Sequence, residues 1–362
     1  MKRATLGAVL LGAVLAVNAT LASAADTSSA TANSGTVGIV SGGIEGTSVR
    51  IAGDLAAVLD QGEELRILPM LGKGSVQNIK DIMFLKGIDI GIVQSDVLAY
   101  AKRERLVPNV SQKIKYITKL YNEELHILAA QGITRIEDLA GRKVNFDVQG
   151  SGTHMTASLI FGMLGIQAEV EHNDQALALE KLRKGEIAAM AYVAGKPARL
   201  FRDLKEAEGL HFLSVPITPE LLETYLPSRL TSDDYEGLIK PDDKVDTVAV
   251  GAVMAVYGWD KNTERYRKVA RFVEAFFNRF DEFLKPPRHP KWKEVNLAAD
   301  IPGWSRFEPA EALLRPAQPP GALMSDAATR SAFRSFVAQR GIPADQADKL
   351  FEQFLLWQAR TQ

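Results

Sequence analysis

The chain has 362 residues, of which 46% are apolar and none is cysteine, and its formal net charge is −1. It therefore lacks the basic excess typical of nucleic-acid-binding proteins, and it excludes disulfides, thiolate zinc sites and a lipid-modified N-terminal cysteine. A chain of this length buries a large core, and we expect two lobes.

The first 25 residues have the pattern of a secretory signal peptide. Lys2 and Arg3 precede an apolar run at 4–17, and small residues suited to a signal peptidase follow at 22–24. This run is shorter than the roughly 20 residues that a membrane span needs. We therefore expect residues 1–25 to be removed and the mature protein to be periplasmic.

From Thr36 onward, segments with strand and helix character alternate. Strands are expected at 37–40, 65–68 and 88–93, and helices at 49–59 and 76–85. This βαβαβ order predicts a mainly parallel sheet. Ligands bind at the carboxyl ends of such strands, which would bring together three loops: 41–48, 72–75 and 94–96.

The same architecture repeats from about Leu125. Strands are expected at 126–129, 144–146 and 187–191, helices after Gly152 and at 177–182, and a final segment at 210–215. The repetition predicts a second α/β lobe.

A long apolar stretch, Val248 to Tyr257, predicts a buried strand that returns to the first lobe with the helix behind it. The chain would then cross between lobes near 121–124 and 245–247, and two crossings form a hinge. The expected domains are a signal peptide (1–25), lobe 1 (36–122 and 247–285), lobe 2 (123–246) and a C-terminal extension rich in Pro and aromatic residues (286–362).

The extension ends in a helical pattern with an apolar stripe from Ala347 to Leu355. Packing of this stripe against the body is the simpler interpretation. Docking to a membrane partner or a second subunit is the alternative. We expect the protein to be a monomer.

The turn Val148-Gln-Gly-Ser-Gly-Thr-His154 lies between a predicted strand and a predicted helix. Unpaired N–H groups and the helix dipole favour a negative group there, so the turn resembles an anion cradle. The plainer interpretation is that Ser151 or Thr153 only caps the helix. The loop 41–48 suggests a second cradle, unless its glycines serve only a tight turn.

Nucleotide and catalytic motifs are missing from these loops. Neither has the ending of a P-loop or the G-x-G-x-x-G spacing, and the chain has no G-x-S-x-G elbow and no H-E-x-x-H helix. We therefore expect no cofactor, no metal and no catalytic residue. Arg50 could pair with a ligand carboxylate or lie on a solvated helix face, and His154 could make affinity pH-dependent or be a simple first-turn residue.

Five short motifs, taken in order, resemble the TAXI family, the extracytoplasmic solute receptors of TRAP transporters. The resemblance spans about 36–280, and its motifs are Ser41-Gly42-Gly43 with Gly46-Thr47, Val93-Gln94-Ser95-Asp96, Leu120-Tyr121, Gly150-Ser151-Gly152-Thr153, and Val193-Ala194-Gly195. Where the family usually has aromatic residues and a proline, this chain has Ser48, Val49 and Arg50.

The resemblance implies an α/β, two-lobed type II periplasmic binding protein. Its lobes would close on a small anionic organic solute, either an amino acid such as glutamate or a dicarboxylate or oxoacid. It would deliver this solute to the membrane permease subunits of a TRAP-type secondary transporter. The implied ligand-binding residues are Thr47, Ser48, Ser75, Gln94 and Ser95 on one wall and Ser151, Gly152, Thr153, Ala194 and Gly195 on the other, with Arg50, His154 and Tyr192 as further candidates.

Two other functions stay open from the sequence. A sensory receptor would present its closed form to a membrane signalling protein. A secreted α/β enzyme would need Asp96, His154 or Glu45 as acid or base, whereas the candidate loops consist of Gly, Ser and Thr, which bind without proton chemistry. We therefore expect a binding protein and not an enzyme.

Overall fold

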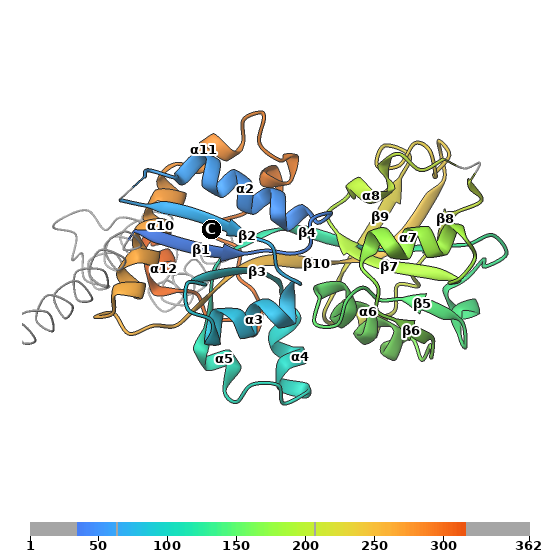
Figure 1. Cartoon of the computed structure of the whole chain (residues 1–362), viewed down its shortest axis with the longest axis horizontal. Helices are drawn as coiled ribbons and strands as arrows, with labels where there is room; N and C mark the ends of the chain where they lie inside the picture. The colour runs from blue at the N-terminus through green and yellow to red at the C-terminus, as the bar shows by residue number, and fades with distance from the viewer. Residues whose placement is uncertain (1–34, 63, 206–207, 316–362) are drawn as a thin grey trace, which may run out of the picture. The chain divides into compact units, whose positions relative to one another are not determined.

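The computed structural model describes residues 35–62, 64–205 and 208–315, and these form two α/β halves joined by two long strands (Figure 1). The first half comprises residues 35–120 and 252–315, and the second half comprises 125–248. Residues 121–124 and 249–251 are the crossing segments. The expected signal peptide and the stripe at 347–355 lie outside the described residues.

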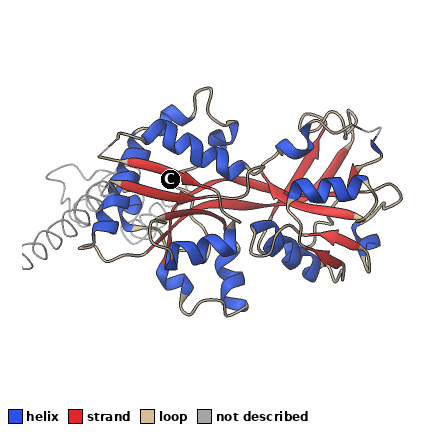
Figure 2. Ribbon diagram, viewed as in Figure 1, coloured by secondary structure: helices blue, strands red, loops and turns tan. Residues whose placement is uncertain are grey.

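The first half contains a sheet in the order β2-β1-β3-β10-β4. β1 pairs in parallel with both β2 and β3, as the alternating pattern predicts. Helices lie on both sides of this sheet, with α2 and α11 on one side and α3, α4 and α5 on the other (Figures 1 and 2). The elements are β1 (Thr36–Val40), α2 (Thr47–Leu59), β2 (Arg66–Met70), α3 (Ser75–Phe84), β3 (Ile90–Gln94), α4 (Val97–Arg103), α5 (Val110–Lys113), α10 (Glu264–Asn278), α11 (Phe280–Phe283), η3 (Pro290–Glu294) and α12 (Glu308–Leu314).

In the second half, the sheet continues in the order β4-β7-β5-β6, with β5 parallel to β6 and β7. The short strands β8 and β9 pair with β4 and β10. The elements are η1 (Ile136–Leu139), β5 (Lys143–Asn145), α6 (Gly152–Met163), β6 (Glu169–Glu171), α7 (Gln175–Arg183), β7 (Ala189–Ala194), α8 (Arg199–Arg202), β8 (His211–Phe212), α9 (Pro219–Leu222) and β9 (Leu226–Thr231).

Two long strands, β4 (Ile114–Ala129) and β10 (Lys244–Tyr257), run antiparallel through both halves. β4 pairs with β10 up to Glu124 and with β7 from Glu124 onward. β10 pairs with β9 up to Ala249 and with β3 from Ala252. The partner exchange in β10 therefore lies a few residues after the crossing expected at 245–247.

Each half has apolar clusters on the faces of its sheet. In the first half, Ile51 and Leu55 of α2 and Phe272 and Phe276 of α10 are fully buried on one face. All five residues of β3 are buried, as expected for a central strand covered on both faces. The core therefore forms from the helical stripes and apolar runs visible in the sequence.

The described part of the expected C-terminal extension packs into the first half. Trp292 of η3 is fully buried, and its ring centroid lies 4.4 Å from that of Phe283. Its indole Nε1–H donates to Asp54 Oδ2 at 2.9 Å. Phe307 and Ala310 join the same core. Residues 286–314 thus belong structurally to the first half.

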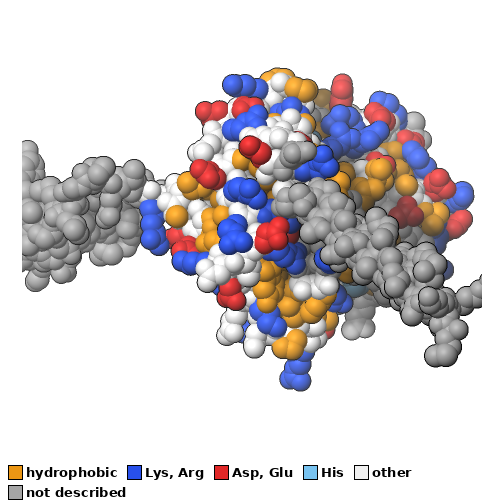
Figure 3. Space-filling view, turned by 60° about the vertical axis from the view of Figure 1, so that its left-hand side comes forward, with side chains coloured by type: hydrophobic (Ala, Val, Ile, Leu, Met, Phe, Trp, Pro, Cys, Tyr) orange, Lys and Arg blue, Asp and Glu red, His pale blue; other side chains and the backbone are white. Residues whose placement is uncertain are grey.

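The surface agrees with a net charge near zero: on the face in Figure 3, basic and acidic side chains are interspersed. None of the helices that the structure describes is both long enough and apolar enough to cross a membrane.

Replacing Trp292 tests whether this segment stabilises the first half. Trp292→Ala is expected to lower the free energy of unfolding by about 3 to 5 kcal/mol, because it leaves a cavity and removes one hydrogen-bond donor to Asp54. Trp292→Phe should cost less because the ring packing is kept. Urea denaturation measures both, and a loss below about 1 kcal/mol for the alanine variant would contradict the assignment.

Candidate functional site

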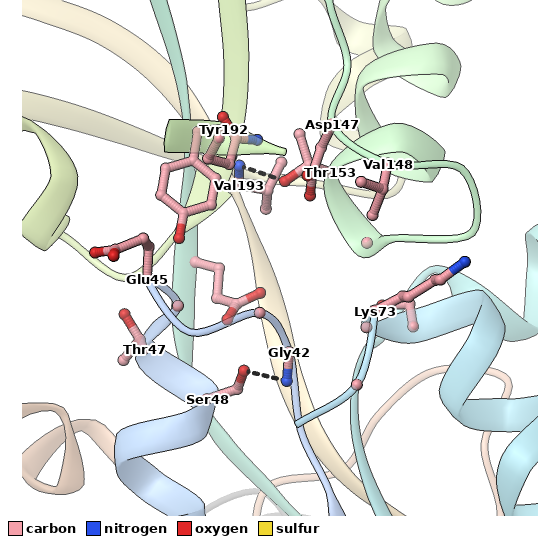
Figure 4. A pocket seen from close by; sticks show the side chains of 18 of the residues that line it. Gly42, Glu45, Thr47, Ser48, Lys73, Asp147, Val148, Thr153, Tyr192 and Val193 are labelled. Atoms are coloured by element: carbon pink, nitrogen blue, oxygen red, sulfur yellow. Dashed lines mark hydrogen bonds between the residues drawn. The ribbon is translucent and has the colours of Figure 1, made fainter. Parts of the chain in front are cut away.

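A cavity of about 200 Å³ lies between the two halves. Glu45, Thr47, Ser48 and Lys73 lie on one side of it, facing Asp147, Thr153 and Tyr192 on the other (Figure 4). Its full lining is Gly42, Gly43, Ile44, Glu45, Gly46, Thr47, Ser48, Gly72, Lys73, Gly74, Ser75, Ile92, Val93, Gln94, Glu123, Asp147, Val148, Gly152, Thr153, Asp174, Gln175, Ala176, Tyr192 and Val193.

Helix N-termini form the first-half wall. α2 and α3 begin after Gly46 and Gly74, and neither helix has a side-chain cap. The first backbone N–H groups of both helices therefore face the cavity region without an accepting side chain. Gly74 has a φ of 105°, and a Cβ there would lie 3.0 Å from the backbone nitrogen of Gly152 in the other half. A glycine is therefore required both by the backbone and by the close approach of the halves.

The second-half wall uses its hydroxyls to build the fold. Ser151 Oγ accepts from the His154 N–H at 3.0 Å and caps α6, which is the plainer of the two interpretations made from the sequence. Thr153 Oγ1 accepts from the Val193 N–H at 3.0 Å (Figure 4). Thr153 lines the cavity, whereas Ser151 lies behind it.

Four carboxyl groups line the cavity: Glu45, Glu123, Asp147 and Asp174. Lys73 is the single lysine or arginine among the lining residues; its side chain is exposed and extends away from Glu45 and Tyr192 (Figure 4). The interior is therefore acidic.

Two of these carboxyls are strongly perturbed. Burial raises the pKa of Glu123 to about 7, although Gln94 Nε2 and Tyr121 OH both donate to it at 2.9 Å. Burial also raises the pKa of Asp147 to about 6. Asp147 has a φ of 67°, a left-handed conformation that Asp tolerates better than most residues.

Gln94 connects the cavity to both halves. Its Oε1 accepts from Ser75 Oγ at 3.1 Å and from Thr156 Oγ1 of α6 at 3.2 Å, while its Nε2 donates to Glu123. A Cβ on Gly152 would lie 2.3 Å from Gln94 Oε1. Gly152 can therefore approach Gln94 this closely only because glycine has no side chain.

Direct hydrogen bonds hold the halves in a closed arrangement. Thr156 Oγ1 and Tyr225 OH of the second half donate to Asp96 Oδ2 of the first half at 2.9 and 3.1 Å. The Gln77 N–H donates to the Gly150 carbonyl at 3.1 Å. Asp96 is buried, and burial raises its pKa to about 6.

The remaining predicted residues lie around the cavity. Seven of the thirteen candidates line it: Thr47, Ser48, Ser75, Gln94, Gly152, Thr153 and Tyr192. Six do not: Ser95, Ser151, Ala194, Gly195, Arg50 and His154. Gly195 still contacts the first half, because its carbonyl accepts from Thr47 Oγ1 at 3.4 Å. Arg50 lines a second, neighbouring cavity.

Sequence reasoning missed Glu123, Asp147 and Gln175. Gln175 opens α7, and its buried Oε1 has no hydrogen-bond partner among the residues that the structure describes. An orphaned acceptor in a cavity wall suits a donor group on a ligand. Asp147 stands three residues before Gly150 in the Gly-Ser-Gly turn, and nothing in the sequence marks it as buried.

The residues named for the enzyme alternative do not converge. Glu45 lines the cavity, but Asp96 is engaged with Thr156 and Tyr225, and the His154 ring packs on His172 at 4.9 Å between centroids. Within the described residues, no cluster of His, Asp and Glu could hold a metal ion.

Sequence comparison assigns this chain to a known family. A sequence model of the NMT1-like family matches residues 39–302. The chain belongs to the NMT1-like family. The fold class expected from the sequence, a two-lobed type II periplasmic binding fold, is confirmed.

Several solved structures are similar in arrangement at low sequence identity. The chain is 13% identical to an ancestral arginine-binding protein bound to arginine, covering 69% of this chain and 96% of that one with a TM-score of 0.42. It is 16% identical to the GluR0 ligand-binding core from Nostoc punctiforme in complex with L-glutamate, covering 71% of this chain and 95% of that one with a TM-score of 0.40. It is 15% identical to the alkanesulfonate-binding protein SsuA from Xanthomonas axonopodis pv. citri bound to MOPS, covering 85% of this chain and 93% of that one with a TM-score of 0.43.

The raised pKa of Glu123 predicts an unusual pH dependence of stability. The folded protein keeps this proton up to about pH 7, whereas the unfolded chain loses it near pH 4.3, so Glu123 lowers the free energy of unfolding as pH rises through this window. Between pH 4 and pH 8, the free energy of unfolding of Glu123→Gln should therefore rise relative to that of wild type by on the order of 2 to 3 kcal/mol.

Denaturant unfolding at several pH values measures this difference. Glu274→Gln, at an exposed position of α10, is the matched control and should follow wild type. Parallel curves for wild type and Glu123→Gln would show that the carboxyl is not protonated in the folded protein.

Proposed function

We propose that this protein is a periplasmic receptor that encloses one small organic solute between its halves and passes it to a membrane transporter. The supporting observation is the cavity of about 200 Å³ closed by hydrogen bonds between the halves and lined from both. A solute that contacts both walls would stabilise closure over the open form. No bond of the solute would be made or broken.

The solute class follows from two opposite features of the cavity. Its carboxyl groups and the orphaned Gln175 Oε1 favour a positively charged donor such as an ammonium group. The uncapped starts of α2 and α3 favour a carboxylate. We therefore propose an amino acid, such as glutamate or glutamine. Dicarboxylates and oxoacids, the other solutes expected from the sequence, would place negative charge beside Glu123 and Asp147 with no cation to offset it.

Delivery to a TRAP-type secondary transporter is supported by the five ordered motifs that resemble TAXI receptors. The signal-peptide pattern at 1–25 supports a periplasmic location. Sensing by a membrane signalling partner is the alternative destination for the same closed form.

Calorimetric titration with glutamate, glutamine, 2-oxoglutarate and C4-dicarboxylates tests the solute class. Wild type should bind an amino acid more tightly than 2-oxoglutarate, which lacks the ammonium group. Asp147→Asn should weaken amino-acid binding at least about tenfold, or about 1.4 kcal/mol, and leave oxoacid binding unchanged or stronger.

Asp233→Asn, an exposed carboxyl in the same half, is the charge-matched control and should not alter binding. Tighter binding of an oxoacid or dicarboxylate by wild type would reject the ammonium site but keep the receptor. No binding across the panel by well-folded protein would count against the amino-acid proposal.

A methyl group at Gly152 should block closure. Gly152→Ala places a Cβ against Gln94 Oε1, and Gln94 cannot turn away without breaking its bonds to Ser75 and Glu123. We expect a larger radius of gyration in small-angle X-ray scattering and at least about tenfold weaker solute binding. Gly162→Ala in the same helix, where the added Cβ meets nothing within 4 Å, should behave as wild type. Equal compactness of both variants would show that closure does not depend on Gly152.

A further inference from the structure

A second cavity, of about 300 Å³, adjoins the first. Glu45 and Thr47 line both cavities. The other residues of the second cavity are Arg50, Pro197, Arg199, Arg202, Asp203 and His289. Three arginines and a histidine therefore face two carboxylates, so the cavity carries a net positive charge.

The positive groups come from both halves. Arg50 lies on α2, and His289 directly precedes η3, so both belong to the first half. Arg199 and Arg202 are the first and last residues of α8 in the second half. The arginine cluster therefore draws on both halves.

The three guanidinium groups are unpaired within the described part of the chain. Arg50, Arg199 and Arg202 are exposed, and none forms an ion pair or hydrogen bond with another described residue. The neighbouring Arg288 differs, because it pairs with Asp54 at 3.4 Å. Exposed arginines of like charge repel one another, and the carboxylates of Glu45 and Asp203 offset only two of the three positive charges, so the cavity favours an anion.

His289 adds a fourth donor. Its Nδ1 accepts from the Lys291 N–H at 3.2 Å, which places the ring proton on Nε2 of the neutral imidazole. Burial lowers the pKa of His289, and the positive charges of Arg50, Lys291 and Arg202 lower it further. The negative charge of Asp54 raises it in part. Arg50 and Arg202, from opposite halves, therefore act on the same ring.

We propose that this second cavity is an anion-binding site that takes a carboxylate or phosphate group and joins the two halves through it. Guanidinium groups match the paired oxygens of both anions and bind them through charge-assisted hydrogen bonds. An anion held by Arg50 and by Arg199 or Arg202 favours the closed form. By linkage, it raises the affinity of the first cavity for its solute. Anion binding itself does not require the proposed function, and only its effect on solute affinity rests on that function.

The anion has two sources, a free small ion or the acidic side chains of a docking protein, and two probes separate them. Inorganic phosphate tests the first source and hexaglutamate peptide the second. Each is titrated into the full protein by calorimetry at low ionic strength, near 0.01 M, where charge interactions are least screened. No solute is needed, so a failure of solute binding leaves this test intact.

The test variant is Arg50→Gln/Arg199→Gln, which removes one guanidinium from each half. The control, Arg66→Gln/Arg142→Gln, removes one exposed arginine from each half away from the cavity. We expect wild type and control to bind at least one probe within about twofold of each other, and the test variant to bind at least about tenfold more weakly.

Phosphate binding with this pattern identifies a small-ion site, and binding of hexaglutamate alone identifies a docking site for acidic side chains. Either supports the proposal. Absence of binding by wild type to both probes, or equal weakening in the test variant and the control, overturns it.

Discussion

The antiparallel pairing of β4 with β10 is the constraint on which the rest of the structure depends. Both strands run through the two halves, so the halves share one hydrogen-bonded sheet instead of being joined by loops. The register shifts between Gly251 and Val253, beside the point where β10 changes partners. An irregularity of this kind bends the strand that carries it, so it is the place where a movement of one half relative to the other would be taken up.

The same strand carries two adjacent carboxyls to different surroundings. Because side chains alternate along a strand, Glu123 faces the cavity and Gln94, while Glu124 faces Lys291 and the Lys196 N–H, which lies 2.8 Å from Glu124 Oε2. Burial raises the pKa of both glutamates. Glu124 has a buried cation 3.4 Å away, whereas Glu123 has only neutral donors. A cationic solute group beside Glu123 would supply the positive partner that this carboxyl lacks and would favour its ionised form.

The sequence predicted the architecture better than the site. Helical stripes and apolar runs are local patterns, and they located the parallel strands, α2, α3, α6 and the return through β10. Loop composition also located the cavity, where Thr153 lines the wall, and it could not show that Ser151 and Thr153 both accept from backbone N–H groups of the fold. Glu123 and Asp147 gave no signal of their own, because their importance comes from burial by segments distant in the chain.

Helix α2 connects the two cavities physically. Thr47 and Arg50 are three residues apart, so they lie on the same side of its first turn, with Thr47 lining both cavities and Arg50 only the second. A shift of this rigid helix therefore changes both cavities at once. Glu45, which directly precedes the N-cap of this helix, also lines both cavities. A cation bound in the first cavity or an anion bound in the second would therefore change the electrostatic surroundings of the same carboxyl group. Because opposite charges attract, an ammonium group in the first cavity and an anion in the second stabilise the same closed arrangement.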